Sequence, residues 1–304
     1  MTARWGGKNL ARSQKTGVSI AIWNAAVYRW FPGLPAPAVL LHPDGPSVTY
    51  HDLNVEVRGP VDAPPLLLLH GWGSNAKNMI PLAKALSSYR THAIDLPGHG
   101  ASPPPPEPWG IPEHATLLHA YVENEIQGPV TIIGHSNGGR IALHMASTAD
   151  FADVIERLVL ISPSGVQPER SLGYRVRSGF ATALKAPVQA LPSPLREPAM
   201  DWLRHSLVWR LLGSSDYNTL SGVMRETFVK TVNHHLNGDL RRIQVPTLLF
   251  WGTADEAVSR RQMNVIEESI DDCGLVELDG AGHYGHLDDF EAVLSATRHF
   301  LENG

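Results

Sequence analysis

The sequence predicts an α/β protein in which a mostly parallel sheet carries helices on both faces and a helical segment is inserted between two strands. Short apolar runs, typical of buried strands, alternate with longer helix-like stretches along most of the chain. The alternation stops over residues 165–242 and then resumes. With 304 residues, of which 43 % are hydrophobic and 18 % are charged, the chain can bury a sizeable core.

The first half of the chain begins the alternation. Polar and apolar side chains alternate over residues 47–58, which predicts a β-hairpin or two short strands. Leu66–Leu69 is a continuous apolar run after two prolines and is typical of a buried parallel strand. The elements expected after it are helix 76–89, strand 92–96, helix 113–127, strand 130–134, helix 137–147 and strand 158–161.

Residues 165–242 contain no strong strand run, and they include helix-like stretches such as 200–212 and 223–235. The segment is too long for a plain loop. The elements expected after it are strand 247–251, helix 260–270, strand 275–278 and helix 290–301. We therefore expect a core made of residues 45–164 and 243–304, interrupted by a helical cap over 165–242.

Residues 1–44 form an extension before the predicted sheet. Its apolar stretch, residues 18–31, is interrupted by Asn24 and Arg29, so it cannot span a bilayer. One face of this stretch carries apolar side chains at helical spacing: Ile20, Trp23, Val27 and Trp30. We expect an amphipathic helix packed on the main domain, with a weak contact of residues 18–31 with a membrane surface as the alternative.

Net charge and cysteine content exclude several kinds of protein. The formal charge of −5 makes the chain a poor non-specific binder of nucleic acid, so no nucleic-acid partner is expected. Cys273 is the only cysteine, which excludes an intramolecular disulfide and a cysteine-based zinc site. It follows two aspartates and has no basic neighbour, so we expect an inert thiol. A cytoplasmic location is compatible with this content and is the expected one.

Residues 134–138 read Gly-His-Ser-Asn-Gly, the pattern G-x-S-x-G, between a predicted strand and a predicted helix. A serine on so sharp a turn needs small neighbours two residues away, and Gly134 and Gly138 meet that need. The N-terminus of the following helix favours negative charge that develops beside the serine. In this context the motif predicts a nucleophile at Ser136.

A nucleophilic serine needs a base, and the base needs a carboxylate that orients it. Asp255 follows the predicted strand 247–251, and His283 follows the predicted strand 275–278. Both residues therefore lie beyond the carboxyl ends of strands of one sheet, where the sites of open α/β sheets form.

Five segments, taken in order, resemble the α/β-hydrolase fold family, and within it the cap-bearing serine esterases and carbon–carbon bond hydrolases. They are His70-Gly71-Trp72-Gly73, the segment 95–102 (DLPGHGAS), Gly134-His-Ser-Asn-Gly-Gly139, Gly252-Thr-Ala-Asp255 and Gly282-His283. The resemblance covers about residues 45–304. It is highly specific for the fold and much less specific for the substrate.

The resemblance implies a role for each matching residue. Ser136 corresponds to the nucleophile, His283 to the general base and acid, and Asp255 to the carboxylate that orients the histidine. The backbone amides of Trp72 and Asn137 correspond to the oxyanion hole. No cofactor and no metal are expected.

Two neighbours offer alternative assignments. Glu256 adjoins Asp255 and could serve as the acid, and His286 could serve as the base. In similar sequences the histidine preceded by glycine takes this role, which favours His283. The acidic and histidine residues around it could be imagined as a metal cluster, but they lack a recognised ligand spacing: His283, His286, Asp288 and Asp289.

A helical cap over the site would exclude water and shape the substrate pocket. Gly71, His135 and the cap residue Trp202 are expected to line this pocket. Residues 165–242 carry a net charge of +5, against −10 for the remainder. This uneven distribution indicates either a basic face docked on an acidic one or a preference for anionic acyl substrates.

The sequence therefore predicts a carboxylesterase that cleaves small or medium acyl esters through an acyl-enzyme intermediate, with a small-molecule acyl compound as its partner. One alternative is hydrolysis of a carbon–carbon bond in a vinylogous diketone acid, and another is a ligand-sensing protein with a silent triad. The sequence indicates no particular substrate and no oligomeric state.

Overall fold

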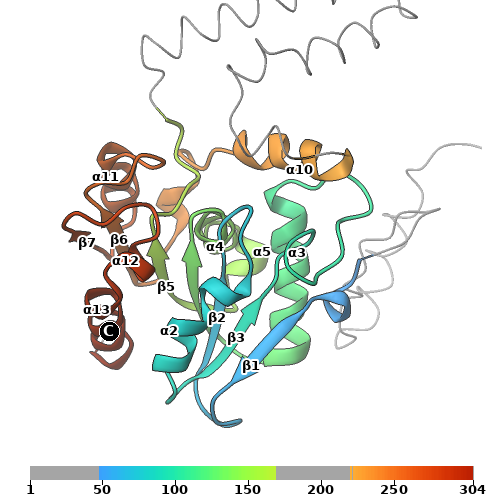
Figure 1. Cartoon of the computed structure of the whole chain (residues 1–304), viewed down its shortest axis with the longest axis horizontal. Coiled ribbons are helices and arrows are strands. Elements are labelled where there is room, and N and C mark those ends of the chain that lie inside the picture. Colours follow the sequence, from blue (N-terminus) through green and yellow to red (C-terminus); the bar gives the residue numbers. More distant parts are fainter. Residues whose placement is uncertain (1–47, 169–219, 221, 304) are drawn as a thin grey trace, which may run out of the picture. The chain divides into compact units, whose positions relative to one another are not determined.

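The sheet is the centre of the computed structural model, which describes residues 48–168, 220 and 222–303 (Figure 1). Among these residues it has seven strands in the order β1-β3-β2-β4-β5-β6-β7. Their bounds are β1 (Val55–Arg58), β2 (Pro65–Leu69), β3 (Arg90–Ile94), β4 (Val130–His135), β5 (Ile155–Ile161), β6 (Thr247–Gly252) and β7 (Cys273–Leu278). The pairing of β1 with β3 is antiparallel, and every other pairing is parallel.

Helices alternate with the strands along most of the described chain. The longer ones are α3 (Ile111–Tyr121), continued by the π-helical turn η3 (Val122–Ile126), α4 (Asn137–Ser147), α10 (Gly222–Val232), α11 (Arg260–Ser269) and α13 (Phe290–Asn303). The shorter ones are η1 (Tyr50–Asp52), η2 (Ala76–Asn78), α2 (Ile80–Ala85), α5 (Ala149–Ala152), η4 (Leu240–Arg242) and α12 (Gly285–Asp288).

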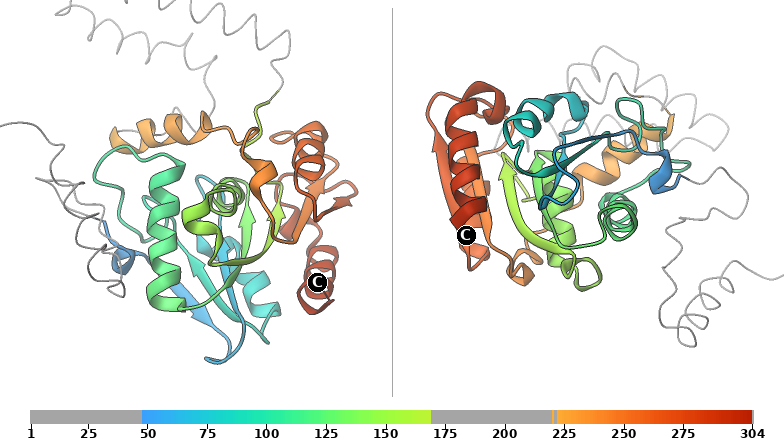
Figure 2. Two further views of the ribbon diagram at one scale, coloured as in Figure 1. Left: turned by 180° about the vertical axis from the view of Figure 1, so that it is seen from behind. Right: turned by 90° about the horizontal axis from the view of Figure 1, so that it is seen from below.

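Successive strand residues point to opposite faces of the sheet, and each face has its own core. Leu67 and Leu69 of β2 pack in a cluster with residues of α3, α4 and α11. Leu66 and Leu68 pack instead with residues of α2 and α13. Figure 2 shows these helices on the two sides of the sheet. The predicted fold class, a mostly parallel sheet with helices on both faces, is confirmed.

The prediction for residues 47–58 was wrong in part, because only Val55–Arg58 is a strand and no hairpin forms. The residues before it make the short 3₁₀ helix η1. The Asp52 carboxylate accepts hydrogen bonds from the backbone amide and the hydroxyl of Thr49, at 2.7 and 2.9 Å. This local capping box competes successfully with strand pairing.

The strand expected at 92–96 lies instead at Arg90–Ile94. The chain leaves the ladder after Ile94 because the next amides have other partners. The amide of Asp95 donates to the Asn54 carbonyl at 2.9 Å, and the amide of Leu96 donates to Nε2 of His70 at 2.9 Å. The helix expected at 76–89 is also shorter, since only 76–78 and 80–85 are helical.

The chain between β5 and β6 corresponds to the expected insertion. Its described part contains α10, where residues 223–235 had predicted a helix. Residues 169–219, with the expected helix 200–212 and Trp202, lie outside the described residues, as do residues 1–44 and their expected amphipathic helix. Within the described ranges, no helix combines the length and the apolar character needed to cross a bilayer.

Candidate active site

Four loops meet where the parallel strands end, at the same edge of the sheet. Gly71 and Trp72 follow β2, and Ser136 follows β4. Asp255 follows β6, and His283 follows β7. The topology therefore collects residues that are as far apart in the sequence as Gly71 and His283, because the carboxyl ends of parallel strands lie together.

Ser136 lies on a strained turn between β4 and α4. Its φ of +49° lies in the left-handed half of backbone space, which a non-glycine residue adopts rarely. Its amide donates to the Ile161 carbonyl at 3.0 Å, and its carbonyl accepts from the amides of Arg140 and Ser164 at 3.0 and 3.1 Å. These bonds hold the turn in place despite its strained conformation.

The glycines around Ser136 are required by close backbone approaches. A Cβ atom on Gly138 would lie 2.3 Å from the Leu69 carbonyl oxygen, and one on Gly134 would lie 2.7 Å from the amide nitrogen of Gly139. A Cβ on Gly139 would lie 2.8 Å from Pro163. Small residues at these positions therefore let α4 begin directly against the ends of the neighbouring strands, as the motif predicted.

His283 and Asp255 form a hydrogen-bonded pair. Nδ1 of His283 lies 2.9 Å from Oδ2 of Asp255. The Asp255 side chain is fully buried, whereas that of His283 is 22 % exposed. Because the carboxylate occupies Nδ1, the other ring nitrogen of His283 is left to exchange a proton with a reacting group.

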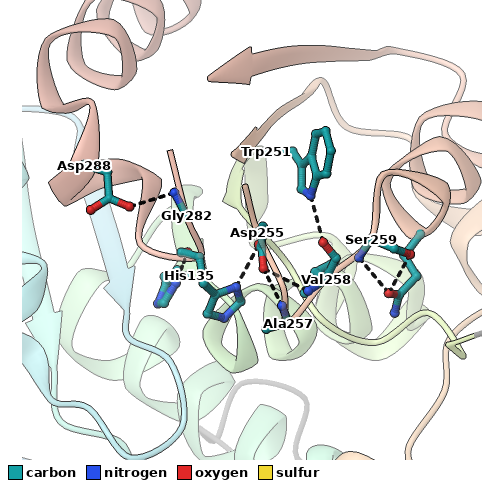
Figure 3. A network of polar contacts seen from close by, with 10 residues as sticks. His135, Trp251, Asp255, Ala257, Val258, Ser259, Gly282 and Asp288 are labelled. Atoms are coloured by element: carbon teal, nitrogen blue, oxygen red, sulfur yellow. Dashed lines mark hydrogen bonds and ion pairs between the residues drawn. The ribbon is translucent and has the colours of Figure 1, made fainter. Parts of the chain in front are cut away.

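The second carboxylate oxygen of Asp255 accepts from the amides of Ala257 and Val258, at 2.8 and 3.0 Å (Figure 3). Burial acts to raise the pKa of Asp255. The hydrogen bonds from His283 and the Val258 amide, with the nearby His283 charge, outweigh burial and lower this pKa below its ordinary value. The carboxylate therefore remains ionised and fixed in orientation.

His135 directly precedes Ser136 at the end of β4 and holds the loop that carries His283. Its Nε2 lies 2.9 Å from the His283 carbonyl oxygen, so Nε2 must carry the proton and donate. Burial, with the nearby His286 and His283, lowers the pKa of His135 well below its ordinary value. A Cβ on Gly71 would lie 2.8 Å from the other ring nitrogen, so Gly71 makes room for this neutral histidine.

Two backbone amides are available near Ser136. Asn137 is the first residue of α4, so its amide has no acceptor within the helix. Across the described ranges, the amides of Trp72 and Asn137 donate no hydrogen bond to the protein. Both residues line the cavity beside Ser136. The arrangement provides two donors and a helix N-terminus where negative charge would develop.

A cavity of about 240 Å³ connects these groups. Its described lining residues are Gly71, Trp72, His135, Ser136, Asn137, Arg140, Ser164, Phe228, Thr231, Val232, Ala257, His283 and Tyr284. The predicted residues are thus brought together, with Asp255 attached through His283, except for Trp202, which lies outside the described residues. Sequence reasoning missed five of the described lining residues, because no motif marks them: Ser164, Thr231, Val232, Ala257 and Tyr284.

The neighbouring residues have other partners or positions. Glu256 is exposed to solvent, whereas Asp255 holds His283. His286 is buried within α12, and burial lowers its pKa to about 4. Asp288 accepts a hydrogen bond from the Gly282 amide at 2.9 Å (Figure 3). Burial raises the pKa of the Cys273 thiol to about 12, so the thiol stays protonated and unreactive.

Comparison with known proteins gives consistent matches. A family model described as alpha/beta hydrolase fold matches residues 64–290. A pimeloyl-[acyl-carrier protein] methyl ester esterase of Chromobacterium violaceum is 30% identical over 267 residues, which cover 83% of this chain and 98% of that protein. Lipase LipV of Mycobacterium tuberculosis is 34% identical over 145 residues, 48% of this chain and 53% of the lipase. The solved structure of a hydrolase from Pseudomonas aeruginosa is similar, with a TM-score of 0.63 and 23% identity, covering 86% of this chain and 97% of that one.

Proposed function

The chain belongs to the α/β hydrolase fold family, and we propose that within it this protein is a serine carboxylesterase that cleaves small or medium acyl esters. The observation that carries the proposal is the pairing of His283 with Asp255 beside a cavity that Ser136 also lines. The ester-cleaving activities named for two relatives support the same type of reaction.

In the proposed reaction, Oγ of Ser136 attacks the ester carbonyl carbon while His283 accepts its proton. Asp255 holds the histidine through Nδ1 and stabilises the positive charge that the ring acquires. The amides of Trp72 and Asn137 bind the oxyanion of the tetrahedral intermediate. His283 then returns the proton to the departing alcohol, and water releases the acyl group by the same steps.

We also propose that the insertion acts as a cap through α10. Phe228 of this helix contacts Trp72, with ring centroids 5.1 Å apart. Oγ1 of Thr227 accepts from the Trp109 amide at 3.1 Å, and Nζ of Lys230 donates to the Pro108 carbonyl at 2.6 Å. α10 thus covers the loops that border the cavity and excludes water from one side of it.

Hydrolysis of a carbon–carbon bond would use the same serine, histidine and oxyanion hole, and it is the second candidate. The two reactions are distinguished by their substrates. A carboxylesterase turns over p-nitrophenyl esters rapidly, whereas a carbon–carbon bond hydrolase turns over vinylogous diketone acids and leaves the esters nearly intact. The names of the relatives favour the ester reaction.

The substitution Ser136→Ala tests the proposal. We expect hydrolysis of p-nitrophenyl esters to fall by about 10⁴-fold or more, and covalent labelling by a fluorophosphonate probe to disappear. Ser88→Ala, which changes an exposed serine, is the control and should retain both. Full turnover and full labelling of Ser136→Ala would contradict the assignment.

A further inference from the structure

We propose that the cavity beside Ser136 binds a free carboxylate of the substrate through the guanidinium of Arg140, so that the preferred esters are anionic. This inference rests on the proposed function, because it specifies the substrate class of that same site. It is carried by the position of Arg140, by unpartnered polar atoms around it and by the absence of a neutralising acid among the described residues that line the cavity.

Arg140 lies one helical turn after Ser136 on α4 and is only 7 % exposed. It lines the 240 Å³ cavity and also an adjoining cavity of about 360 Å³. A hydrogen bond and a close packing contact fix its side chain. One guanidinium nitrogen donates to the Thr231 carbonyl of α10, and Gly165 leaves space for the aliphatic part of the side chain.

Among the described residues that line the smaller cavity, three polar side-chain atoms are buried without a hydrogen-bond partner. They are Nε of Arg140, Oδ1 of Asn137 and Oγ1 of Thr231. Asn137 and Thr231 are 4 % and 2 % exposed, so bulk solvent does not satisfy them. Unpartnered buried polar atoms are rare and costly in native proteins, and three around one cavity indicate a polar ligand.

The charge of Arg140 is not neutralised within the described residues. None of the described residues that line either cavity is an aspartate or a glutamate. Among the described groups, Asp239 is paired with Arg242 at 3.0 Å. The positive charge of Arg140 lowers the pKa of His234, in addition to the larger effect of burial on that ring.

The ligand that suits these groups is a carboxylate. A buried guanidinium without a counter-ion is unfavourable, and an anion relieves that cost while accepting charge-assisted hydrogen bonds. The hydroxyl of Thr231 can donate a further, neutral hydrogen bond to it. Burial lowers the pKa of Arg140 to about 10, so the side chain still carries its charge at neutral pH.

Matched pairs of esters test the inference on the unaltered protein. One pair is monomethyl adipate and dimethyl adipate, which places the carboxylate on the acyl side of the ester. The other pair is 4-acetoxybutyrate and its methyl ester, which places it on the alcohol side. We expect the anionic member of one pair to have a kcat/KM about 10- to 100-fold higher than its neutral partner, as a charged hydrogen bond of about 1.5–3 kcal/mol implies.

Two substitutions show whether Arg140 causes this preference. Arg140→Gln should abolish the preference while it changes turnover of the neutral ester much less, and Arg140→Lys should restore part of it. Arg241→Gln removes an exposed charge of η4 and should leave the preference unchanged. The Kd of adipate reports carboxylate binding without catalysis. It is measured for the Ser136→Ala protein with and without Arg140→Gln.

The outcomes distinguish the inference from the proposed function. If the protein hydrolyses neutral and anionic esters equally and adipate does not bind, the carboxylate site is wrong and the esterase proposal stands. If adipate binds through Arg140 but no ester is cleaved, the esterase proposal is wrong and the carboxylate site stands. An equal loss of both ester activities in a folded Arg140→Gln protein, with unchanged adipate binding, would assign Arg140 a structural role only and overturn the inference.

Discussion

At the scale of single residues, the candidate site depends on a few atoms that close packing and hydrogen bonds hold in place. Ser136 holds a φ of +49°, and the glycines around it allow backbone contacts that a Cβ would block. His283 is oriented by Asp255 on one side, and its backbone is held by His135 on the other. Strain at Ser136 is thus balanced by hydrogen bonds from several separate segments.

Replacing Gly138 by alanine tests how tightly the turn is packed. The added Cβ would lie 2.3 Å from the Leu69 carbonyl oxygen, so β2 and α4 must separate. We expect the free energy of unfolding to fall by about 1–3 kcal/mol and ester hydrolysis to be lost with it. Gly128→Ala is the matched control, because a Cβ there meets no atom within 4 Å. Equal Tm values for the two variants would contradict the expectation.

Replacing Asp255 by asparagine tests the orienting carboxylate. The amide keeps the shape of the side chain but can no longer stabilise a charged His283, so kcat should fall by about 10³- to 10⁴-fold with little change in KM. Glu256→Gln, at the adjacent exposed position, should leave kcat unchanged. The reverse pattern would make Glu256 the acid, the alternative that the sequence left open.

At the scale of elements, α10 connects the insertion to the sheet domain. It contributes Phe228, Thr231 and Val232 to the cavity and contacts the loops after β2 and β3. The same helix accepts the hydrogen bond that fixes Arg140. A shift of α10 would therefore change both the size of the cavity and the position of its positive charge.

The substitution Phe228→Ala tests the contribution of this helix to substrate size. It removes the ring that packs against Trp72 at the cavity wall, and the space gained can hold additional methylene groups, each worth about 0.8 kcal/mol when buried. We expect the preferred acyl chain in a p-nitrophenyl ester series to become longer. Val229→Ala, at the exposed neighbouring position, should keep the original preference. An unchanged chain-length profile in Phe228→Ala would show that α10 does not limit the cavity.

At the scale of the whole molecule, several histidines are buried in neutral form. Burial lowers the pKa of His70, His114 and His286 to about 4. The neutral state of His70 also follows from its contacts, because Nε2 must accept from the Leu96 amide while Nδ1 donates to the Gly71 carbonyl. Protonation would break the first of these bonds.

Stability should therefore decrease as the pH falls from about 6.5 towards 4. In this interval the unfolded chain binds protons that the folded chain excludes, so each such histidine lowers the free energy of unfolding by up to about 1.4 kcal/mol per pH unit. Asp255 and Asp95 have lowered pKa values, so their contribution is lost only below about pH 3.8.

Urea unfolding between pH 7.5 and 4.5 measures this dependence. The slope of the free energy of unfolding against pH reports how many protons are taken up on unfolding. His114→Gln should lower this number by up to one, because the glutamine side chain cannot become charged. A stability that does not change between pH 6.5 and 4.5 would contradict the neutral burial of these histidines.

The residues of the candidate site could largely be predicted from the sequence, whereas some element boundaries could not. Ser136, Asp255 and His283 each follow an apolar strand run, so their location at one edge of the sheet follows from local pattern and topology. The strand at 90–94 was misplaced because the residues that end it bond to Asn54 and His70, which are distant in the chain. Local propensity contains no information on such partners.

The sequence alone determined the α/β class, the positions of most parallel strands and the turn at Ser136, because apolar spacing and glycine sterics act between near neighbours. Only the tertiary structure decided that Asp255 bonds to Nδ1 of His283, that β1 pairs antiparallel to β3, and that Arg140 is buried beside the cavity of Ser136 and bonds to α10. The residues joined by the first and last of these contacts are 28 and 91 positions apart in the chain. Contacts of this kind arise from the packing of complete elements against one another, which no local pattern encodes.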